Sequence, residues 1–385
     1  MKRDLLQSYK EELAQLEARS NLRTLPEVVH RGRDVIRQGR RMLNLSSNDY
    51  LGLASELSLR KTFLESLTPE RFLPSSSSSR LLTGNFEANG ALEELLCRLY
   101  EAESCLVFNS GYHMNTGILP AVGNAKTLIL ADRLVHASLI DGIRLSPAKF
   151  IRYRHNNYEH LESLLHHNHA DYERIIIVTE SIFSMDGDEA DLRRLVALKK
   201  SYPNVMLYVD EAHAVGVRGG KGLGYAEEQG CIADIDFLAG TFGKALASVG
   251  GYVLCRRVMR NFLVNKMRTL IFTTALPPVN LMWTHFVLER LEGFDNRRDV
   301  LKKMSLRLRE GLIAKGYACP SGSHIVPVMT GGSREAVLKA EELQREGFYL
   351  LPVRPPTVPE GTSRIRISLT ASVRAEEVEH LVSLL

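Results

Sequence analysis

Several side chains that could do chemistry stand directly after short apolar runs. Asp210 and His213 lie in "YVDEAH", at the end of one such run, and Lys244 follows another in "GTFGKAL". An acid, an imidazole and an amine are the groups that enzymes use for proton transfer and covalent catalysis. Taken singly, Asp210 would more often cap a helix and His213 would more often be a structural histidine. Their chemistry therefore depends on whether the fold brings them together.

The apolar runs have the pattern of buried parallel strands. Continuous apolar segments at "SCLVFNSG", "KTLILAD", "RIIIVTES", "NVMLYVDEAH" and "IDFLAGTFGK" alternate with helical segments such as "ADLRRLVALKKSY". This alternation is typical of a parallel sheet covered on both faces by helices. Ligands of such sheets bind beyond the carboxyl ends of the strands. We therefore expect the following residues to share one edge of the sheet: Gly111, Tyr112, His136, Ser181, Ser184, Asp210, His213, Thr241 and Lys244.

This set of side chains suits pyridoxal phosphate. The cofactor needs a lysine that holds it covalently and a carboxylate that keeps its pyridine nitrogen protonated. Its phosphate needs backbone N–H groups at a helix N-terminus. The segment "NSGYHMNTGIL" offers such a cradle, because Gly111 lets the backbone approach closely, and His136 in "DRLVHASL" could lie over the ring. A Walker A loop is excluded, because neither Lys244 nor Lys221 is followed by Ser or Thr.

Composition sets the class of protein. The chain has 385 residues, 44% of them hydrophobic and 24% charged, which is ordinary for a globular protein. Its net charge of 49 − 45 = +4, without a basic run, gives no indication of a nucleic-acid partner. Five cysteines without zinc spacing predict reduced thiols and no metal site. With no signal peptide and no apolar run of ~20 residues, we expect a cytoplasmic protein without a membrane segment.

The pattern changes towards the ends of the chain. The last hundred residues alternate helical segments with short strands ("HIVPVMT", "FYLLPV", "SRIRISL"), which predicts a smaller α+β domain. We expect three parts: an N-terminal segment 1–47 that joins the small domain, a large domain 48–285 and a small domain 286–385. Within the first part, helical spacing of apolar residues predicts an amphipathic helix through Leu5, Leu6, Tyr9, Leu13 and Leu16.

Over nearly its whole length the chain resembles the α-oxoamine synthases, which are fold-type I pyridoxal-phosphate enzymes. The matching segments are "LNLSSNDYLGL", "FNSGYHMNTG", "DRLVHASLIDG", "VTESIFSMDGD", "VDEAHAVGVRGGKGLG" and "GTFGKALASVGGY". The resemblance implies an α/β fold, with a large domain built on a mostly parallel sheet and a smaller α+β domain. It also implies a homodimer that condenses an amino acid with an acyl-CoA. The segment "RPPTVPEGTSRIRISLTA" is most similar to the members that use L-alanine and a pimeloyl thioester, carried by CoA or by a carrier protein.

The resemblance implies a role for each matching residue. Lys244 would hold the cofactor and later move the substrate's Cα proton, while Asp210 would pair with the pyridine nitrogen. His136 would stack on the ring, and Arg366 would grip the substrate carboxylate with a bidentate guanidinium. The other implied contacts are His213 and Ser184 at the phenolic oxygen; Gly111, Tyr112 and Thr241 at the phosphate, with Thr273 or Thr274 from a partner subunit; and Asn48, Thr357 and Arg23 at the substrates, Arg23 at the distal carboxylate of a pimeloyl chain.

The segment "PSSSSSRLLTG", residues 74–84, has the composition of a flexible linker. It nevertheless lies between two segments that match the family, whose members carry a glycine- and serine-rich loop ending in arginine here. We therefore expect an ordered loop near a dimer interface, with Arg80 as its anchor. Serines stand where glycines are usual, so a backbone angle that needs glycine is the point to examine.

Three other functions compete with this interpretation. One is a related α-oxoamine synthase that uses glycine or serine, such as a 2-amino-3-ketobutyrate CoA ligase, because the cofactor apparatus is shared. Another is a non-catalytic scaffold subunit of the same fold, which should have lost its lysine, whereas Lys244 is present. A dehydrogenase is disfavoured, because no G-x-G-x-x-G follows an early strand.

Overall fold

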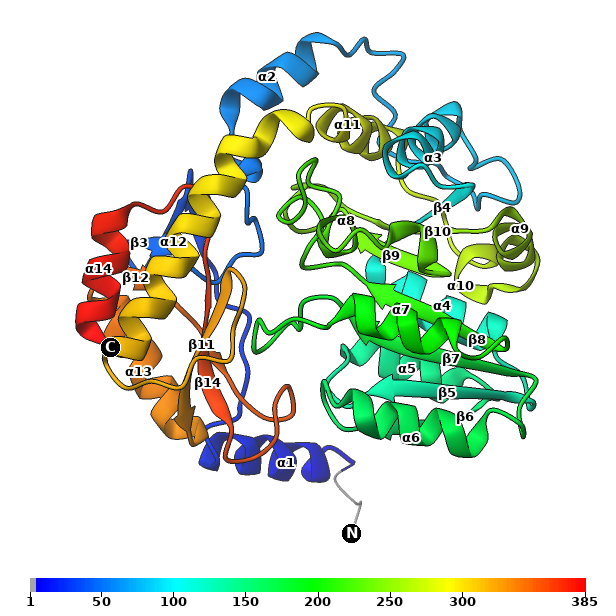
Figure 1. Cartoon of the computed structure of the whole chain (residues 1–385). Helices are drawn as coiled ribbons and strands as arrows, with labels where there is room; N and C mark the ends of the chain where they lie inside the picture. The colour runs from blue at the N-terminus through cyan, green and yellow to red at the C-terminus, as the bar shows by residue number, and fades with distance from the viewer. Residues whose placement is uncertain (1–4) are drawn as a thin grey trace. The chain divides into compact units, whose positions relative to one another are not determined.

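A seven-stranded sheet forms the centre of the larger of two compact units (Figure 1). The computed structural model describes residues 5–385. The strand order is β4-β10-β9-β8-β7-β5-β6. The strands are β4 Ser104–Phe108, β5 Thr127–Asp132, β6 Lys149–Tyr153, β7 Arg174–Glu180, β8 Val205–Asp210, β9 Phe237–Thr241 and β10 Gly251–Cys255.

The predicted parallel sheet is confirmed, with one antiparallel strand inside it. Strand β10 runs antiparallel to both β4 and β9, and the other pairs are parallel. The carboxyl ends of the remaining six strands therefore lie at one edge. Strands β6 and β10 are absent from the predicted apolar runs. Strand β6 is an edge strand that carries exposed charged residues, so its sequence lacks the continuous apolar pattern of a central strand.

Helices cover both faces of this sheet. In Figure 1, α6 and α7 lie in front of the strands, and α4 and α5 lie behind them. Four helices that follow strands of the sheet are capped by a side chain: those of Ser110, His136, Asn157 and Asp191 accept a backbone N–H from the first turn. The helices of this unit are α2 Leu57–Glu65, α3 Glu87–Tyr100, α4 Gly111–Val122, α5 Ala137–Leu145, α6 Tyr158–Asn168, α7 Leu192–Lys200, α8 Tyr225–Glu228, α9 Arg257–Lys266, α10 Arg268–Ile271 and α11 Pro278–Leu288.

The smaller unit is the predicted α+β type, with two small sheets. Strands β1-β2-β3-β12 form one sheet and β11-β14-β13 form the other. The strands are β1 Val29–Arg31, β2 Asp34–Arg37, β3 Arg40–Asn44, β11 Ile325–Gly331, β12 Phe348–Tyr349, β13 Pro352–Val353 and β14 Ser363–Ser368. Its helices are α1 Gln7–Ala18, α13 Ser333–Arg345 and α14 Ala375–Leu384, together with most of α12 Asp295–Ala314.

The boundaries of the units differ from the predicted ones. The large unit comprises 51–184 and 188–299, and the small unit comprises the chain through Tyr50, Met185–Gly187 and Val300–Leu385. The predicted boundary at 285/286 falls within α11, whose buried residues Leu281, Phe286 and Val287 continue the core of the large unit past that point. The short segment Met185–Gly187 had no sequence signal. An ion pair between Asp186 and Arg364 joins it to the small unit.

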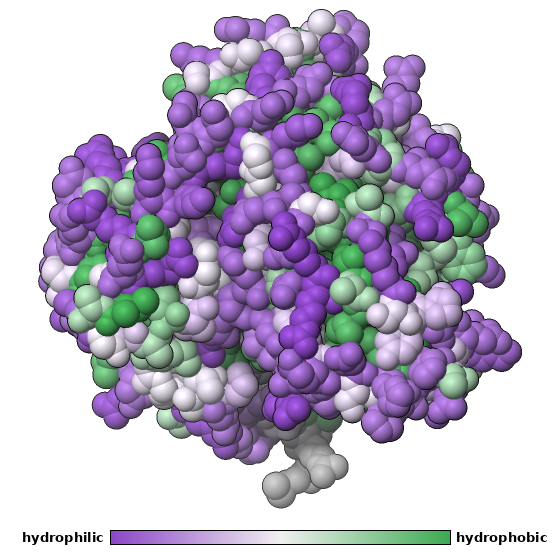
Figure 2. All heavy atoms as spheres, in the orientation of Figure 1, coloured by the Kyte–Doolittle hydropathy of each residue, from purple (hydrophilic) through white to green (hydrophobic). Residues whose placement is uncertain are grey.

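The predicted N-terminal helix is present but begins later than expected. Helix α1 starts at Gln7, so Leu5 and Leu6 precede it. Its apolar side is exposed within this chain, with Tyr9 at 65% and Leu13 at 53% exposure. The face drawn in Figure 2 is mainly hydrophilic, with smaller hydrophobic groups among the polar residues. Among the helices of residues 5–385, none is long and apolar enough to cross a membrane.

Candidate active site

Asp210 is the last residue of β8 and lies at the centre of a buried hydrogen-bond network. Its side chain is 5% exposed; Oδ2 accepts from Asn115 Nδ2 at 2.8 Å, and Oδ1 accepts from the N–H of Ala212 at 2.9 Å. Asn115 is held in turn, because its Oδ1 accepts from the Tyr208 hydroxyl at 2.6 Å. Tyr208 therefore orients the amide that orients the carboxylate. Sequence reasoning missed Asn115, which lies in the second turn of α4.

The same amide reaches His136. Asn115 Nδ2 also donates to Ser138 Oγ at 2.9 Å, and Ser138 Oγ lies 2.8 Å from His136 Nδ1. The backbone N–H of Ser138 donates to Nδ1 at 3.2 Å, so the proton of the neutral ring belongs on Nε2. Burial lowers the pKa of His136; the Asp210 charge opposes this, and the charge of Lys244 adds to it. A neutral imidazole is suited to lie against a cationic ring.

A second buried carboxyl group, Glu180, stands beside Asp210. Glu180 ends β7 and pairs with Asp210 in the register of β7 and β8. Burial raises the pKa of Glu180 well above its ordinary value, and the neighbouring Asp210 raises it further, against the effect of Lys244. A protonated Glu180 spares the site two adjacent carboxylate charges. The sequence signal was a carboxyl group at the end of an apolar run, where charged residues are rarely buried.

The N-terminus of α4 offers backbone N–H groups of the kind that bind a phosphate. The helix begins at Gly111, and the first N–H groups of a helix lack intrahelical partners. A Cβ atom at Gly111 would lie 3.7 Å from Thr241 Cβ and 3.8 Å from its Oγ1. Gly111 and Thr241 are therefore close neighbours, and a side chain at position 111 would be in van der Waals contact with Thr241. The hydroxyl of Thr241 is oriented by donating to the Gly250 carbonyl at 2.8 Å.

The other predicted residues of the large unit follow the ends of strands β4, β7, β8 and β9. Tyr112, in the first turn of α4, donates its hydroxyl hydrogen bond to Asp141. Ser184 and His213 are buried beyond the ends of β7 and β8, and Lys244 lies three residues beyond the end of β9.

Thr273 and Thr274 were predicted to reach a partner's cofactor. Within this chain, Asn109 Nδ2 donates to the Thr274 carbonyl at 2.6 Å and to Thr273 Oγ1 at 3.3 Å. Asn109 lies two residues before Gly111, so both threonines lie near the start of α4 of their own chain. Their predicted role towards a partner subunit stays a prediction.

This donor set fits pyridoxal phosphate. Lys244 supplies an amine, Asp210 supplies an oriented buried carboxylate, and the Gly111–Thr241 cradle supplies N–H groups and a hydroxyl. The charge of Lys244 lowers the pKa of both His136 and Glu180, which places Lys244 near these strand ends.

In the small unit, Arg366 of β14 is held by neutral oxygen atoms. One terminal nitrogen donates to Ser368 Oγ at 2.6 Å and to Asn48 Oδ1 at 3.2 Å, and the other donates to the Tyr50 hydroxyl at 3.4 Å. Tyr50 is fully buried and donates to Asn48 Oδ1 at 3.0 Å. The predicted residues Arg366 and Asn48 are thus brought together, and these contacts orient the guanidinium.

A second group of side chains in the small unit, which we call the cationic group, contains Arg23, Arg354 and Thr357. Arg23 donates to Thr357 Oγ1 at 3.2 Å and to the carbonyls of Arg354 and Pro355 at 3.2 and 3.0 Å. Sequence reasoning missed Arg354, whose guanidinium donates to the carbonyls of Ser20 and Leu22. Burial lowers the pKa of Arg354, and the nearby charge of Arg23 lowers it further. Two arginine charges that act on each other favour an anionic ligand.

The serine run is a fixed loop. Ser76 Oγ donates to the Ala275 carbonyl at 2.7 Å, and the Ala275 N–H donates to the Ser78 carbonyl at 2.9 Å. Arg80 forms a buried ion pair with Glu93 at 2.6 Å. Ser77 adopts a left-handed backbone with φ of 53°, which is the conformation that glycine would adopt without strain. The segment is therefore the expected ordered loop with Arg80 as an anchor, and its place near a dimer interface stays a prediction.

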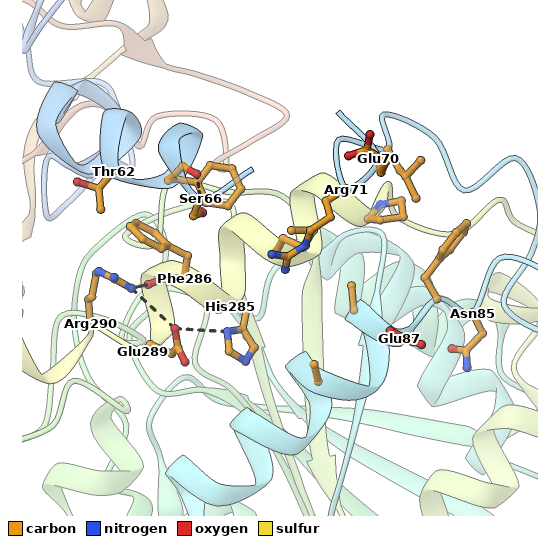
Figure 3. Close-up of a pocket in the computed structure, with 17 residues that line it drawn as sticks. Thr62, Ser66, Glu70, Arg71, Asn85, Glu87, His285, Phe286, Glu289 and Arg290 are labelled. Atoms are coloured by element: carbon orange, nitrogen blue, oxygen red, sulfur yellow. Dashed lines mark hydrogen bonds and ion pairs between the residues drawn. The ribbon is translucent and has the colours of Figure 1, made fainter. Parts of the chain in front are cut away.

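A pocket of about 930 Å³ lies apart from the residues predicted for the site (Figure 3). It is lined by residues of α2, α3 and α11 and by the segment between α2 and α3. On its α11 side, Glu289 lies 3.6 Å from His285 and 3.8 Å from Arg290. None of the predicted cofactor or substrate residues lines this pocket.

Comparisons with known proteins agree with this geometry. Residues 40–385 match the family model of aminotransferase class I and II. Relatives named "Putative 8-amino-7-oxononanoate synthase" are 54% identical over 380 residues in Haemophilus influenzae (99% of this chain, all of the relative) and 56% identical over 370 residues in Neisseria meningitidis (96% and 97%).

The fold is also that of solved structures. Serine palmitoyltransferase from Sphingomonas wittichii superposes with a TM-score of 0.90 at 31% identity, covering 99% of this chain and 97% of that one. A lysine-to-alanine variant of serine palmitoyltransferase from S. paucimobilis, solved with a bound PLP–myriocin aldimine, has the same TM-score at 29% identity and the same coverage. An 8-amino-7-oxononanoate synthase from Francisella tularensis, at 24% identity, shares the fold with a TM-score of 0.76, covering 89% of this chain and 96% of that one.

The fold, together with His136, Asp210 and Lys244 at or just beyond the strand ends, defines a pyridoxal-phosphate-dependent transferase of fold type I. The chain belongs to the aminotransferase class I and II family, and its resemblance to the α-oxoamine synthases is confirmed. Pyridoxal phosphate is its cofactor.

Proposed function

We propose that the chain condenses L-alanine with a pimeloyl thioester, releasing 8-amino-7-oxononanoate, the thiol and CO2, as a step of biotin biosynthesis. The relatives' names at 54–56% identity support this reaction over other members of the fold. The structural observation that carries it is the contact between Arg23 and Thr357, with Arg354 beside them. A dicarboxylate-derived acyl chain ends in the anion that this cationic group would bind.

Each residue of the site has a chemical task in this reaction. Pyridoxal phosphate, when bound, supplies the electron sink for the electron pair left at the substrate's Cα. Lys244 would hold the cofactor and move the Cα proton. Asp210, oriented by Asn115, would keep the pyridine nitrogen protonated. Gly111 and Thr241 would hold the phosphate, and His136 would cover the ring.

The substrates would be held by their carboxylates. Arg366, oriented by Asn48 and Tyr50, would bind the carboxylate of alanine. Arg23 and Thr357 would bind the distal carboxylate of the acyl chain. In the overall balance, a C–C bond forms between Cα and the thioester carbonyl while the C–S bond breaks. The alanine carboxylate then leaves as CO2, and Cα takes up a proton.

An assay of CO2 and free thiol with matched substrates tests the proposal. L-Alanine with pimeloyl-CoA should release both products in a 1:1 ratio, and the same assay with pimeloyl-carrier protein tells which donor is used. Glycine, L-serine and palmitoyl-CoA are the comparison substrates. Equal or faster turnover of any of these would refute the assignment.

The principal rival is a serine-using acyltransferase. It is favoured by the TM-score of 0.90 with serine palmitoyltransferases. Those structures are 29–31% identical to this chain, well below the curated relatives. Turnover of L-serine with palmitoyl-CoA above that of L-alanine with pimeloyl-CoA would establish the rival.

We also propose a cytoplasmic homodimer. The five cysteines are free thiols, which suits a reducing compartment. The serine loop and the segment hydrogen-bonded to it expose Leu82 at 80% and Phe272 at 70% of their surface. Exposed apolar side chains on adjoining segments are typical of an interface between proteins.

A further inference from the structure

His155 links two carboxylates of the large unit. It follows β6, and its Nδ1 donates to Asp132 Oδ1 at 2.8 Å while its Nε2 donates to Asp188 Oδ2 at 2.6 Å. A neutral imidazole has one N–H, so donating at both ends requires the imidazolium. Burial acts against this charge, but the hydrogen bonds to the two carboxylates outweigh it and raise the pKa of His155 to about 10.

One carboxylate holds the turn that leads to His136. Asp132 is the last residue of β5 and is fully buried. Its Oδ1 also accepts from the N–H of Leu134 at 2.8 Å, and its Oδ2 accepts from the N–H of Asn156 at 2.9 Å. Asp132 therefore fixes the backbone between β5 and His136, which is the N-cap of α5.

The other carboxylate holds the loop that carries Ser184. Asp188 accepts from Asn156 Nδ2 at 2.9 Å, and its carbonyl accepts from the N–H of Phe183 at 2.9 Å. The His155 ring also packs edge-on against Phe183, with centroids 4.5 Å apart. His155 thus contacts the residue before Ser184 and the residue that closes the loop after it.

We propose that His155 is a positioning residue that locks the loop before His136 and the loop around Ser184 into one geometry. The inference rests on the proposed roles of His136 and Ser184 at the cofactor. These residues come from separate loops, yet each must meet the same small ring. Misplacement by about 1 Å can cost about 100-fold in rate. The His155 imidazolium, hydrogen-bonded to Asp132 and to Asp188, holds the two loops in a fixed position relative to each other.

The test compares four variants by hydrogen exchange, first on the holoenzyme and then on the cofactor-free chain. H155Q removes the charge and leaves a carbonyl oxygen against one carboxylate, so exchange should rise over both 132–137 and 182–190. D188A cuts one side only, so exchange should rise over 182–190 and not over 132–137. In H155Q/D188N, the introduced glutamine amide can donate to Asp132, while the introduced asparagine amide donates to the glutamine carbonyl. This double variant should recover most of the protection.

K199Q is the matched control, because Lys199 forms a comparable ion pair with Asp236 at 2.7 Å away from both loops. At equal loss of overall stability, K199Q should leave exchange in both loops and the cofactor's visible absorption unchanged.

In H155Q, cofactor affinity should fall about 10- to 100-fold and the absorption band should shift. The proposal is overturned if H155Q matches K199Q in both readouts, or if the double variant is no better than H155Q. It is also overturned if D188A loosens both loops alike. Should H155Q fail to fold, the one-sided pattern of D188A decides. Because exchange is read without substrate, a failed condensation assay would leave this result standing.

Discussion

At the scale of single residues, the site depends on charges that neighbours set. Glu180 and Asp210 are adjacent in the sheet, and burial together with the Asp210 charge raises the pKa of Glu180. Asn115 and Tyr208 then orient the Asp210 carboxylate. In the small unit, Arg354 places a second cation beside Arg23. Asp210 and Arg23, the side chains with proposed functions, therefore each depend on a neighbour, Asn115 or Arg354, that belongs to no catalytic motif.

Replacing Arg23 with Met should weaken recognition of the distal carboxylate. A hydrogen bond to a charged group contributes about 1.5–3 kcal/mol, so KM for pimeloyl-CoA should rise about 10- to 100-fold. Heptanoyl-CoA lacks the distal carboxylate, and its kinetics should stay unchanged. Arg19→Met, four residues away in the sequence, is the control. Equal loss with both acyl donors would show that Arg23 does not read the carboxylate.

At the scale of elements, the loops are held by contacts that sequence spacing does not display. The serine loop is fixed by its hydrogen bonds to Ala275 and by the Arg80–Glu93 ion pair. The loops beyond β5 and β7 are fixed by His155. A loop of small polar residues can therefore be held in one conformation by hydrogen bonds and ion pairs to distant parts of the chain.

Gly84→Ala should destabilise the serine loop. A Cβ atom at Gly84 would overlap the carbonyl oxygen of Ser78, and overpacking costs about 1–3 kcal/mol. Gly90→Ala in α3 is the matched control, because its Cβ would meet no atom within 4 Å. Alanine should stabilise that helix by up to about 1 kcal/mol. Urea unfolding of both variants measures the difference, and a loss of stability in G90A or none in G84A contradicts the prediction.

Stability should fall at alkaline pH through His155. Its pKa is raised from 6.5 to about 10 in the folded chain, so its stabilisation is complete below pH 6.5 and is lost as pH rises through 10. The slope for one proton is at most about 1.4 kcal/mol per pH unit. Burial raises the pKa of the neighbouring Tyr158 to about 12, and that of Tyr153 well above its ordinary value, so both stay neutral in this range.

Urea midpoints of the wild type and of H155Q between pH 7 and pH 10 measure this effect. The wild type should lose stability faster than H155Q as pH rises. Parallel curves would mean that His155 does not hold its proton in the folded chain.

At the scale of the whole molecule, the chain forms a large α/β unit and a smaller α+β unit. The proposed carboxylate-binding arginines, Arg23 and Arg366, belong to the small unit, while Asp210 and Lys244 belong to the large one.

Light scattering should give about twice the chain mass of 43.2 kDa. The double variant L82E/F272E should reduce it to one chain mass, because two buried charges oppose an apolar interface. Leu338 of α13 is 52% exposed, and L338E is the control that should stay dimeric. A wild type of single chain mass would refute the homodimer.

The sequence by itself predicted five of the seven strands of the large sheet, the residues that follow them and the cofactor. These features are local, because a buried strand is read from a continuous apolar run and its functional residues follow it directly. Asn48 near Arg366 was also expected through the resemblance to the α-oxoamine synthases, as were separate substrate contacts for Arg23 and Thr357.

Only the tertiary structure decided which side chains serve these residues. Asn115 meets Asp210 across 95 positions, Arg23 meets Thr357 across 334, and His155 joins Asp132 and Asp188 across 23 and 33. Such pairs depend on strand order and register, which no local spacing encodes. The contacts of Asn115 and His155 therefore follow from the fold of the sheet and could not be inferred from the sequence around them.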